Sequence, residues 1–191
     1  MRTPPLPKPG EPWIQTFTGI AFPLLRPTVD HIDPDDIAHA LARQCRFGGH
    51  CITFYSVAQH SLLIANWLAK EGFDRRAQLH GLLHDAAEAY VVDIPKPLKP
   101  LIPQHAVIED QVLKVIQEAF GLPPMGHAGL PECVKRADAA ILHDERKRLM
   151  PPKPWSMEWS LSGCGLGVTI ETMMPATAED AFKAKLLELA P

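Results

Sequence analysis

The stretch from Tyr55 to Lys99 carries most of the residues that could do chemistry. It places His60, His84 and Asp85 within helical patterns whose neighbouring positions are apolar, and Asp138 occupies the same kind of position in a later helix. A buried imidazole or carboxylate must be hydrogen-bonded or bound to a metal, because burying it unpaired is costly. Two imidazoles and two carboxylates are ligands typical of a divalent transition metal such as Mn, Co, Fe, Ni or Zn, and less typical of Mg.

Taken singly, these residues have simpler explanations. A lone histidine on an apolar face, such as His60, is more often a hydrogen-bonded core residue, and Asp138 could pair with an arginine. The adjacent pair His84-Asp85 is harder to explain, since two neighbouring polar groups on one buried helix must both find partners. All four together favour a metal site.

Other candidate motifs are weaker. His80 and His84 have the i, i+4 spacing of a zinc helix, but the glutamate of the metalloprotease motif is missing. The cysteines and histidine of residues 45–51 lack the paired C-x2-C spacing of structural zinc. A second His-Asp dipeptide, His143-Asp144, stands in the charged run HDERKR, which we expect to be a solvated face.

Length and composition limit the class of protein. With 191 residues and a net charge of −3, we expect one domain over 1–191 and no binding of nucleic-acid polymers through a basic surface. No apolar run reaches the roughly 18 residues of a membrane span, and the Pro-rich residues 1–12 lack the apolar core of a signal peptide. We therefore expect a cytoplasmic protein with reduced cysteines, no membrane contact and a mobile segment at 1–12.

The pattern of elements predicts an all-α protein with minor β additions. Expected are a short hairpin around Thr18-Gly19, and helices that alternate with Pro-rich or Gly-containing connections. The first helix is capped by Asp33 and runs to Gly48-Gly49, and the second runs from Ser56 to Glu71-Gly72 with a Ser56/Gln59 capping box. A nearly apolar helix follows from Asp74 to Tyr90. Two more helices are expected, near 104–120 and from Pro131 to Pro151. The C-terminal extension 151–191 should add a short strand at GVTIETM and a final amphipathic helix capped by Thr177.

Four segments within residues 46–142 resemble one known family. RFGGH at 46–50, YSVAQHS at 55–61, LLHDAAEAYVVDIPKPLK at 82–99 and VKRADAAIL at 134–142 are similar to the HD-domain metal-dependent phosphohydrolases. The likeness is to the bacterial 5'-deoxynucleotidase branch and the small deoxynucleoside triphosphohydrolases. It implies an HD-domain-like helical bundle.

The resemblance also implies roles for individual residues. His60, His84, Asp85 and Asp138 match the metal ligands, Glu88 the catalytic carboxylate, and Asp93 a second acidic residue near the sugar or the attacking water. For the substrate, Arg46 matches a phosphate-binding arginine and Phe47 a position where an aromatic ring can lie against the base. Lys96 and Lys99, on the Pro-rich loop, either contact phosphate or remain solvated.

The expected function is hydrolysis of a small nucleotide. A divalent metal that polarises a phosphoryl oxygen, a carboxylate that handles a proton and an arginine that balances charge are the parts such a reaction needs. The first prediction is release of phosphate from a nucleoside or deoxynucleoside 5'-monophosphate. The alternatives are a deoxynucleoside triphosphate triphosphohydrolase and a non-catalytic nucleotide-binding HD module. By analogy the chain is expected to form a homo-oligomer, with the final helix as an interface.

Overall fold

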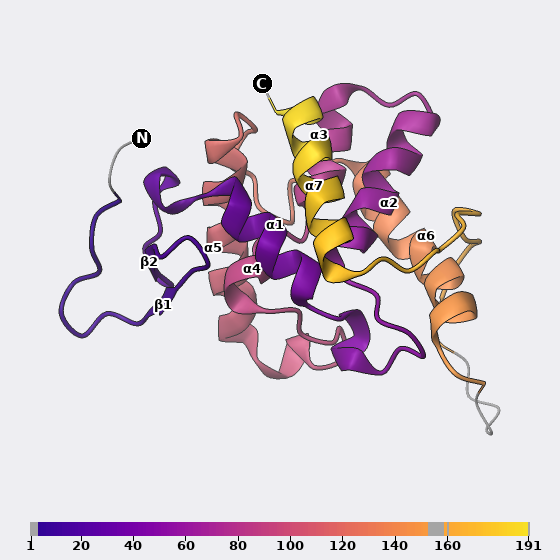
Figure 1. Cartoon of the computed structure of the whole chain (residues 1–191), viewed down its shortest axis with the longest axis horizontal. Coiled ribbons are helices and arrows are strands. Elements are labelled where there is room, and N and C mark those ends of the chain that lie inside the picture. Colours follow the sequence, from indigo (N-terminus) through magenta and orange to yellow (C-terminus); the bar gives the residue numbers. More distant parts are fainter. Residues whose placement is uncertain (1–3, 153–158, 160, 191) are drawn as a thin grey trace.

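The computed structural model describes residues 4–152, 159 and 161–190. It is mostly helical, with one small antiparallel sheet, which confirms the expected class (Figure 1). The strands are β1 (Trp13–Gln15) and β2 (Ala21–Pro23). The helices are α1 (Pro34–Arg43), α2 (Val57–Lys70), α3 (Arg75–Leu83), α4 (Glu88–Val91), α5 (Pro103–Ala119), α6 (Glu132–Leu149) and α7 (Pro175–Leu189), with short 3-10 turns at Val29–His31, Arg46–Gly49 and Lys99–Leu101.

The hairpin is anchored to the helices at two points. Its turn is bound by Asp36 of α1, whose carboxylate accepts from the Thr18 amide at 2.7 Å and from the Thr18 hydroxyl at 2.9 Å. On β2, the fully buried Phe22 stacks on Tyr90 of α4 with ring centroids 3.9 Å apart. The hairpin therefore also supports the short helix that carries Glu88.

Helix α1 begins as predicted and ends earlier. Asp33 accepts a hydrogen bond from the Asp35 amide, the expected N-cap. The helix stops at Arg43 rather than at Gly48-Gly49, because the chain turns extended and Cys45 pairs with Ser56 in an isolated antiparallel bridge. The following turn, Arg46–Gly49, holds Phe47 and Gly48 in the left-handed region, which a continuing helix does not allow.

The expected helix from Asp74 to Tyr90 is divided into α3 and α4. Asp74 caps α3 by accepting from the Ala77 amide at 2.7 Å. After Leu83 the backbone tightens: the Glu88 amide bonds to the Asp85 carbonyl, three residues back, at 3.0 Å. Because residues three apart eclipse in this tighter winding, Asp85 and Glu88 come to the same side of the chain.

Helix α2 keeps half of its expected capping box. Ser56 accepts from the Gln59 amide at 3.1 Å, but the Gln59 side chain bonds elsewhere, to the carbonyl of Glu171 and the amide of Met173. These bonds hold residues 171–173 against α2. The strand expected at GVTIETM is not formed: within the described residues 161–174 the chain is irregular, because it pairs with a side chain rather than with a strand.

Helix α7 starts two residues before the predicted cap at Thr177. Met174 is the N-cap and makes no side-chain cap bond, while Pro175 stands at the first helical position. Phe182 and Leu186 of α7 lie in the main hydrophobic core beside residues of α1, α2 and α3. The C-terminal extension thus contributes directly to that core (Figure 1).

None of the helices in the described ranges combines the length and the hydropathy that crossing a bilayer requires.

The crossing of α2 and α3 gives a prediction about stability. A Cβ on Gly81 would stand 2.6 Å from the Leu68 Cδ1 and 3.2 Å from the Ile64 Cγ2. Gly81→Leu should therefore lower the free energy of unfolding by at least about 2 kcal/mol through overpacking, measured by urea denaturation. Ala69→Leu, at an exposed position of α2, should change it by less than about 0.5 kcal/mol. Equal effects of the two variants would contradict the close crossing.

Candidate metal centre

Two buried histidines face each other at the centre of the site. His60 comes from the middle of α2 and His84 from the residue that ends α3, and their Nε2 atoms are 3.3 Å apart. His60 is fully buried and His84 is 4% exposed. The structure therefore brings His60 and His84 together, as the sequence predicts.

The partners of the other ring nitrogens define the tautomers. His60 Nδ1 lies 2.7 Å from a carboxylate oxygen of Glu145, and His84 Nδ1 lies 2.8 Å from the carbonyl oxygen of Gly81. Both oxygens are acceptors, so both Nδ1 atoms carry the hydrogen and donate it. In the neutral rings, the Nε2 lone pairs therefore point into the same small space.

Two carboxylates complete the cluster. Asp138 Oδ1 from α6 lies 3.2 Å from His60 Nε2 and 3.8 Å from His84 Nε2, while Asp85 Oδ2 lies 3.6 Å and 3.2 Å from the same two atoms. Ligand atoms of His60, His84 and Asp138 all lie within 4.8 Å of one another, so this group could hold a metal ion. Nitrogen and oxygen atoms gathered in this way are ligands that suit a divalent cation.

The charged groups of the cluster perturb one another's pKa. Burial opposes the charged form of His84, yet the nearby carboxylates of Asp85 and Asp138 raise its pKa well above the usual value. Burial likewise opposes the Asp85 carboxylate, but the His84 imidazole holds the Asp85 pKa below its usual range. Asp138 is the most accessible of the four, with 42% of its side chain exposed, so the cluster opens to solvent on the α6 side.

Glu145 is a part of the site that the sequence analysis missed. The expectation that HDERKR forms a solvated face is wrong for this residue, which is fully buried. A signal was present: Glu145 follows Asp138 by seven residues and Ile141 by four, and so continues the buried stripe of α6. His143 and Asp144 do not reach the cluster; they bond to the Ser162 carbonyl and the Gly167 amide.

Arg46 connects Asp85 of the cluster to Glu145. Its Nη1 lies 3.4 Å from Asp85 Oδ2, and its Nε lies 3.4 Å from Glu145 Oε1. The guanidinium also lies 5.5 Å from the ring centroid of Phe47, whose backbone is left-handed. The Phe47 ring is also 5.8 Å from the ring of Trp159, centroid to centroid. Two of the four residues predicted to bind substrate, Arg46 and Phe47, thus lie at or beside the cluster.

Glu88 stands beside the cluster as a buried carboxylate with one oxygen free of partners. Its Oε1 lies 3.6 Å from Lys99 Nζ, whereas Oε2 is buried and has no hydrogen-bond partner among the described residues. Burial, and then the neighbouring charges of Asp85 and Asp93, raise the Glu88 pKa well above its usual value. Such a group can hold a proton near neutral pH and exchange it with a substrate.

Gln44 fixes the backbone on both sides of α4. Its side-chain amide donates to the Glu88 carbonyl at 2.8 Å and accepts from the Asp93 amide at 2.9 Å. Between them, Val92 has a φ of 62°, a conformation that β-branched residues rarely adopt. Asp93 is therefore held close to Glu88 by a constrained turn, in keeping with the two acidic residues predicted to act together.

The two lysines of the Pro-rich loop differ. Lys99 does not stay solvated: its ammonium bonds to Glu109 of α5 at 3.0 Å and approaches Glu88. Lys96 is exposed, and within the described ranges no hydrogen bond or ion pair involves it.

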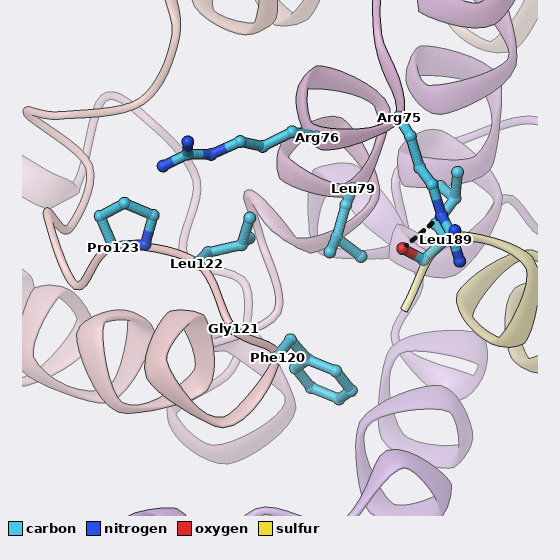
Figure 2. A pocket seen from close by; sticks show the side chains of 8 residues that line it. All are labelled: Arg75, Arg76, Leu79, Phe120, Gly121, Leu122, Pro123 and Leu189. Atoms are coloured by element: carbon cyan, nitrogen blue, oxygen red, sulfur yellow. Dashed lines mark hydrogen bonds between the residues drawn. The ribbon is translucent and has the colours of Figure 1, made fainter. Parts of the chain in front are cut away.

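The protein also has a cavity of about 640 Å³. Figure 2 shows the residues that line it. The cavity is lined by the first turn of α3, the turn after α5 and the end of α7, where Arg75 Nε donates to the Leu189 carbonyl at 3.1 Å. None of the site residues described above lines it.

Comparisons with known proteins place these features in a family context. The chain is 41% identical over 137 residues to the uncharacterised protein YfdR of Escherichia coli, a match that covers 72% of each chain. It is 34% identical over 142 residues to an uncharacterised protein of Rhodobacter capsulatus, again over 72% of each chain. No protein-family model matches. The helices and the His/His/Asp cluster fit an HD-type fold.

Metal content gives the direct test of the cluster. His60→Ala removes one of the converging nitrogen atoms, so it should lose most of the bound divalent metal that the purified wild-type chain retains, as measured by elemental analysis. His143→Ala removes the histidine of the second His-Asp dipeptide and should keep the wild-type content. Equal metal in both variants would contradict the ligand set.

Glu145 should tune metal affinity without touching the ion. Carboxylates that orient ligating histidines affect metal affinity by about 10- to 100-fold. Glu145→Gln keeps the size but loses the charge that faces His60 and Arg46, so we expect metal affinity to fall about 10-fold in competition with a chelating dye. Asp144→Asn, the adjacent change, should leave affinity unaltered. An unchanged metal affinity in Glu145→Gln would show that Glu145 does not support metal binding.

Proposed function

The chain belongs to the same protein family as Escherichia coli YfdR, and we propose that it is a divalent-metal-dependent phosphohydrolase that acts on nucleotides. The observation that carries the proposal is the convergence of His60, His84, Asp85 and Asp138 beside a buried carboxylate, Glu88, that has an unpartnered oxygen. A pure binding module needs no such carboxylate. The preferred reaction is hydrolysis of a nucleoside or deoxynucleoside 5'-monophosphate to a nucleoside and phosphate.

The ligand set supports a metal of the transition series. His60 and His84 offer nitrogen atoms, Asp85 and Asp138 offer oxygen atoms, and mixed ligands of this kind suit Mn, Fe, Co, Ni or Zn better than Mg. When bound there, such an ion supplies polarisation of a phosphoryl oxygen and a lowered pKa for a bound water.

The remaining residues have roles in moving protons and balancing charge. Glu88 takes or delivers a proton through Oε2, the oxygen that no other group engages. Asp93, fixed next to Glu88 through Gln44, adds a second carboxylate near the sugar or the attacking water. Arg46, which is already oriented by Asp85 and Glu145, balances the charge that a phosphate brings.

Phe47 supports a nucleotide as the substrate rather than phosphate alone. Its ring lies next to the Arg46 guanidinium, so a molecule whose phosphate meets Arg46 can place an aromatic base against the ring. Lys96, exposed on the Pro-rich loop, is free to approach the phosphate from solvent. The choice of monophosphate over triphosphate rests on the resemblance of the motifs.

A substrate screen tests the function. The metal-loaded chain is incubated with nucleoside and deoxynucleoside mono- and triphosphates in Mn or Co, and the products are identified by phosphate release and mass. Phosphate from monophosphates supports the proposal. Triphosphate released from a deoxynucleoside triphosphate would replace it with the triphosphohydrolase alternative. Tight binding of nucleotides without turnover would replace it with a non-catalytic module.

Replacing Glu88 should lower the rate of hydrolysis without changing the metal content. Glu88→Gln keeps the side-chain size and removes the proton exchange, so kcat should fall by about 10²- to 10⁴-fold while metal content stays at the wild-type level. The exposed Glu71→Gln serves as the matched control and should keep full activity. A near-normal rate in Glu88→Gln would show that the mechanistic role is wrong.

A further inference from the structure

The Lys99 ammonium lies between two buried carboxylates. Nζ is 3.0 Å from Oε1 of Glu109 and 3.6 Å from Oε1 of Glu88, and both glutamates are less than 5% exposed. The ammonium has three donors, and this arrangement directs them to carboxylates of the protein. Lys99 therefore links α5 to Glu88, the carboxylate beside the cluster of His60, His84, Asp85 and Asp138.

Helix α5 also holds the backbone of α4. His105 Nε2 lies 2.9 Å from the Val91 carbonyl, and because a carbonyl only accepts, Nε2 carries the hydrogen and donates it. Glu109 follows His105 by one helical turn, so both contacts come from the same face of α5. One contact fixes the end of α4, and the other reaches the Glu88 side chain through Lys99.

The burial of Glu109 needs an explanation beyond stability. Its neighbours on α5 include Val112, Leu113 and Ile116, which are fully buried in the main core. An apolar residue would suit this environment, since a buried ion pair is often no more stabilising than well-packed apolar side chains. A carboxylate at 109 does, however, restrict where the Lys99 ammonium can lie.

We propose that Glu109 is a positioning residue that holds Lys99 against one oxygen of Glu88, which leaves the other oxygen of Glu88 directed to proton exchange. This inference rests on the proposed function and deepens it. Lys99 then supports Glu88 instead of contacting the substrate phosphate, the role that the sequence motif suggested for it.

The charges around Glu88 agree with this assignment. Burial, Asp85 and Asp93 each favour the protonated form of Glu88, whereas Arg46 and Lys99 favour the ionised form. Burial opposes the charged form of Lys99 as well, but Glu109 raises the Lys99 pKa above its usual value and keeps the ammonium charged.

A double-mutant cycle tests the chain of contacts. Lys99→Met should lower kcat about 10-fold or more with little change in KM, and Glu109→Gln should lower kcat less. If Glu109 acts through Lys99, the double variant is no slower than Lys99→Met alone. Lys114→Met and Glu118→Gln, at exposed positions of α5, should keep wild-type kinetics. A rise in KM with kcat unchanged, or additive losses in kcat, would overturn the proposal.

A second readout does not depend on turnover. Crystal structures of the full chain are compared for the wild type, Glu109→Gln and the control Glu118→Gln. In Glu109→Gln the Lys99 ammonium should leave Oε1 of Glu88, whereas Glu118→Gln should keep the wild-type position. An unmoved Lys99 in Glu109→Gln overturns the proposal. If the wild-type chain hydrolyses no nucleotide, the proposed function fails, and the position of Lys99 still decides whether Glu109 holds it against Glu88.

Discussion

The hydrogen bond between His60 and Glu145 is the contact on which the rest of the site depends. It joins α2 to α6 and turns the His60 ring so that Nε2 faces the Nε2 atom of His84. The same carboxylate pairs with Arg46, which reaches on to Asp85. A single buried acid therefore sets the orientation of one ligand and, through one arginine, constrains another. The cost of burying this carboxylate is offset by the charge of Arg46 and by the hydrogen bond from His60.

The site has two separately supported parts. The residues that could hold a metal come from α2, α6 and the end of α3. Gly81 contributes both the close approach to α2 and the carbonyl that orients His84. Glu88 lies on α4, which is held by the hairpin through Phe22, by α1 through Gln44 and by α5 through His105 and Lys99. This separation explains why the chain needs so many short elements around one four-residue helix.

Local signals were strong enough to predict most elements and the convergence of His60, His84 and Asp138. Apolar periodicity located His60 and Asp138, and Asp33, Ser56 and Asp74 were recognised as helix caps because capping is a local interaction. The break between α3 and α4 was not predicted, since nothing in the apolar run shows that the helix tightens after Leu83. The partners of Glu145, Lys99 and Gln44 were also beyond prediction, because they lie 10 to 85 residues away in sequence.

The position of Gln44 limits what can replace it. Its single amide group donates to one backbone carbonyl and accepts from one backbone amide, on the two sides of the constrained Val92 turn. Glutamate would set an oxygen against the Glu88 carbonyl, methionine would satisfy neither group, and asparagine is one carbon shorter. Among relatives that keep this turn, we expect glutamine to persist at this position even though it touches neither the metal ligands nor the carboxylate of Glu88. The residue would then look functional in an alignment while its task is to hold the backbone.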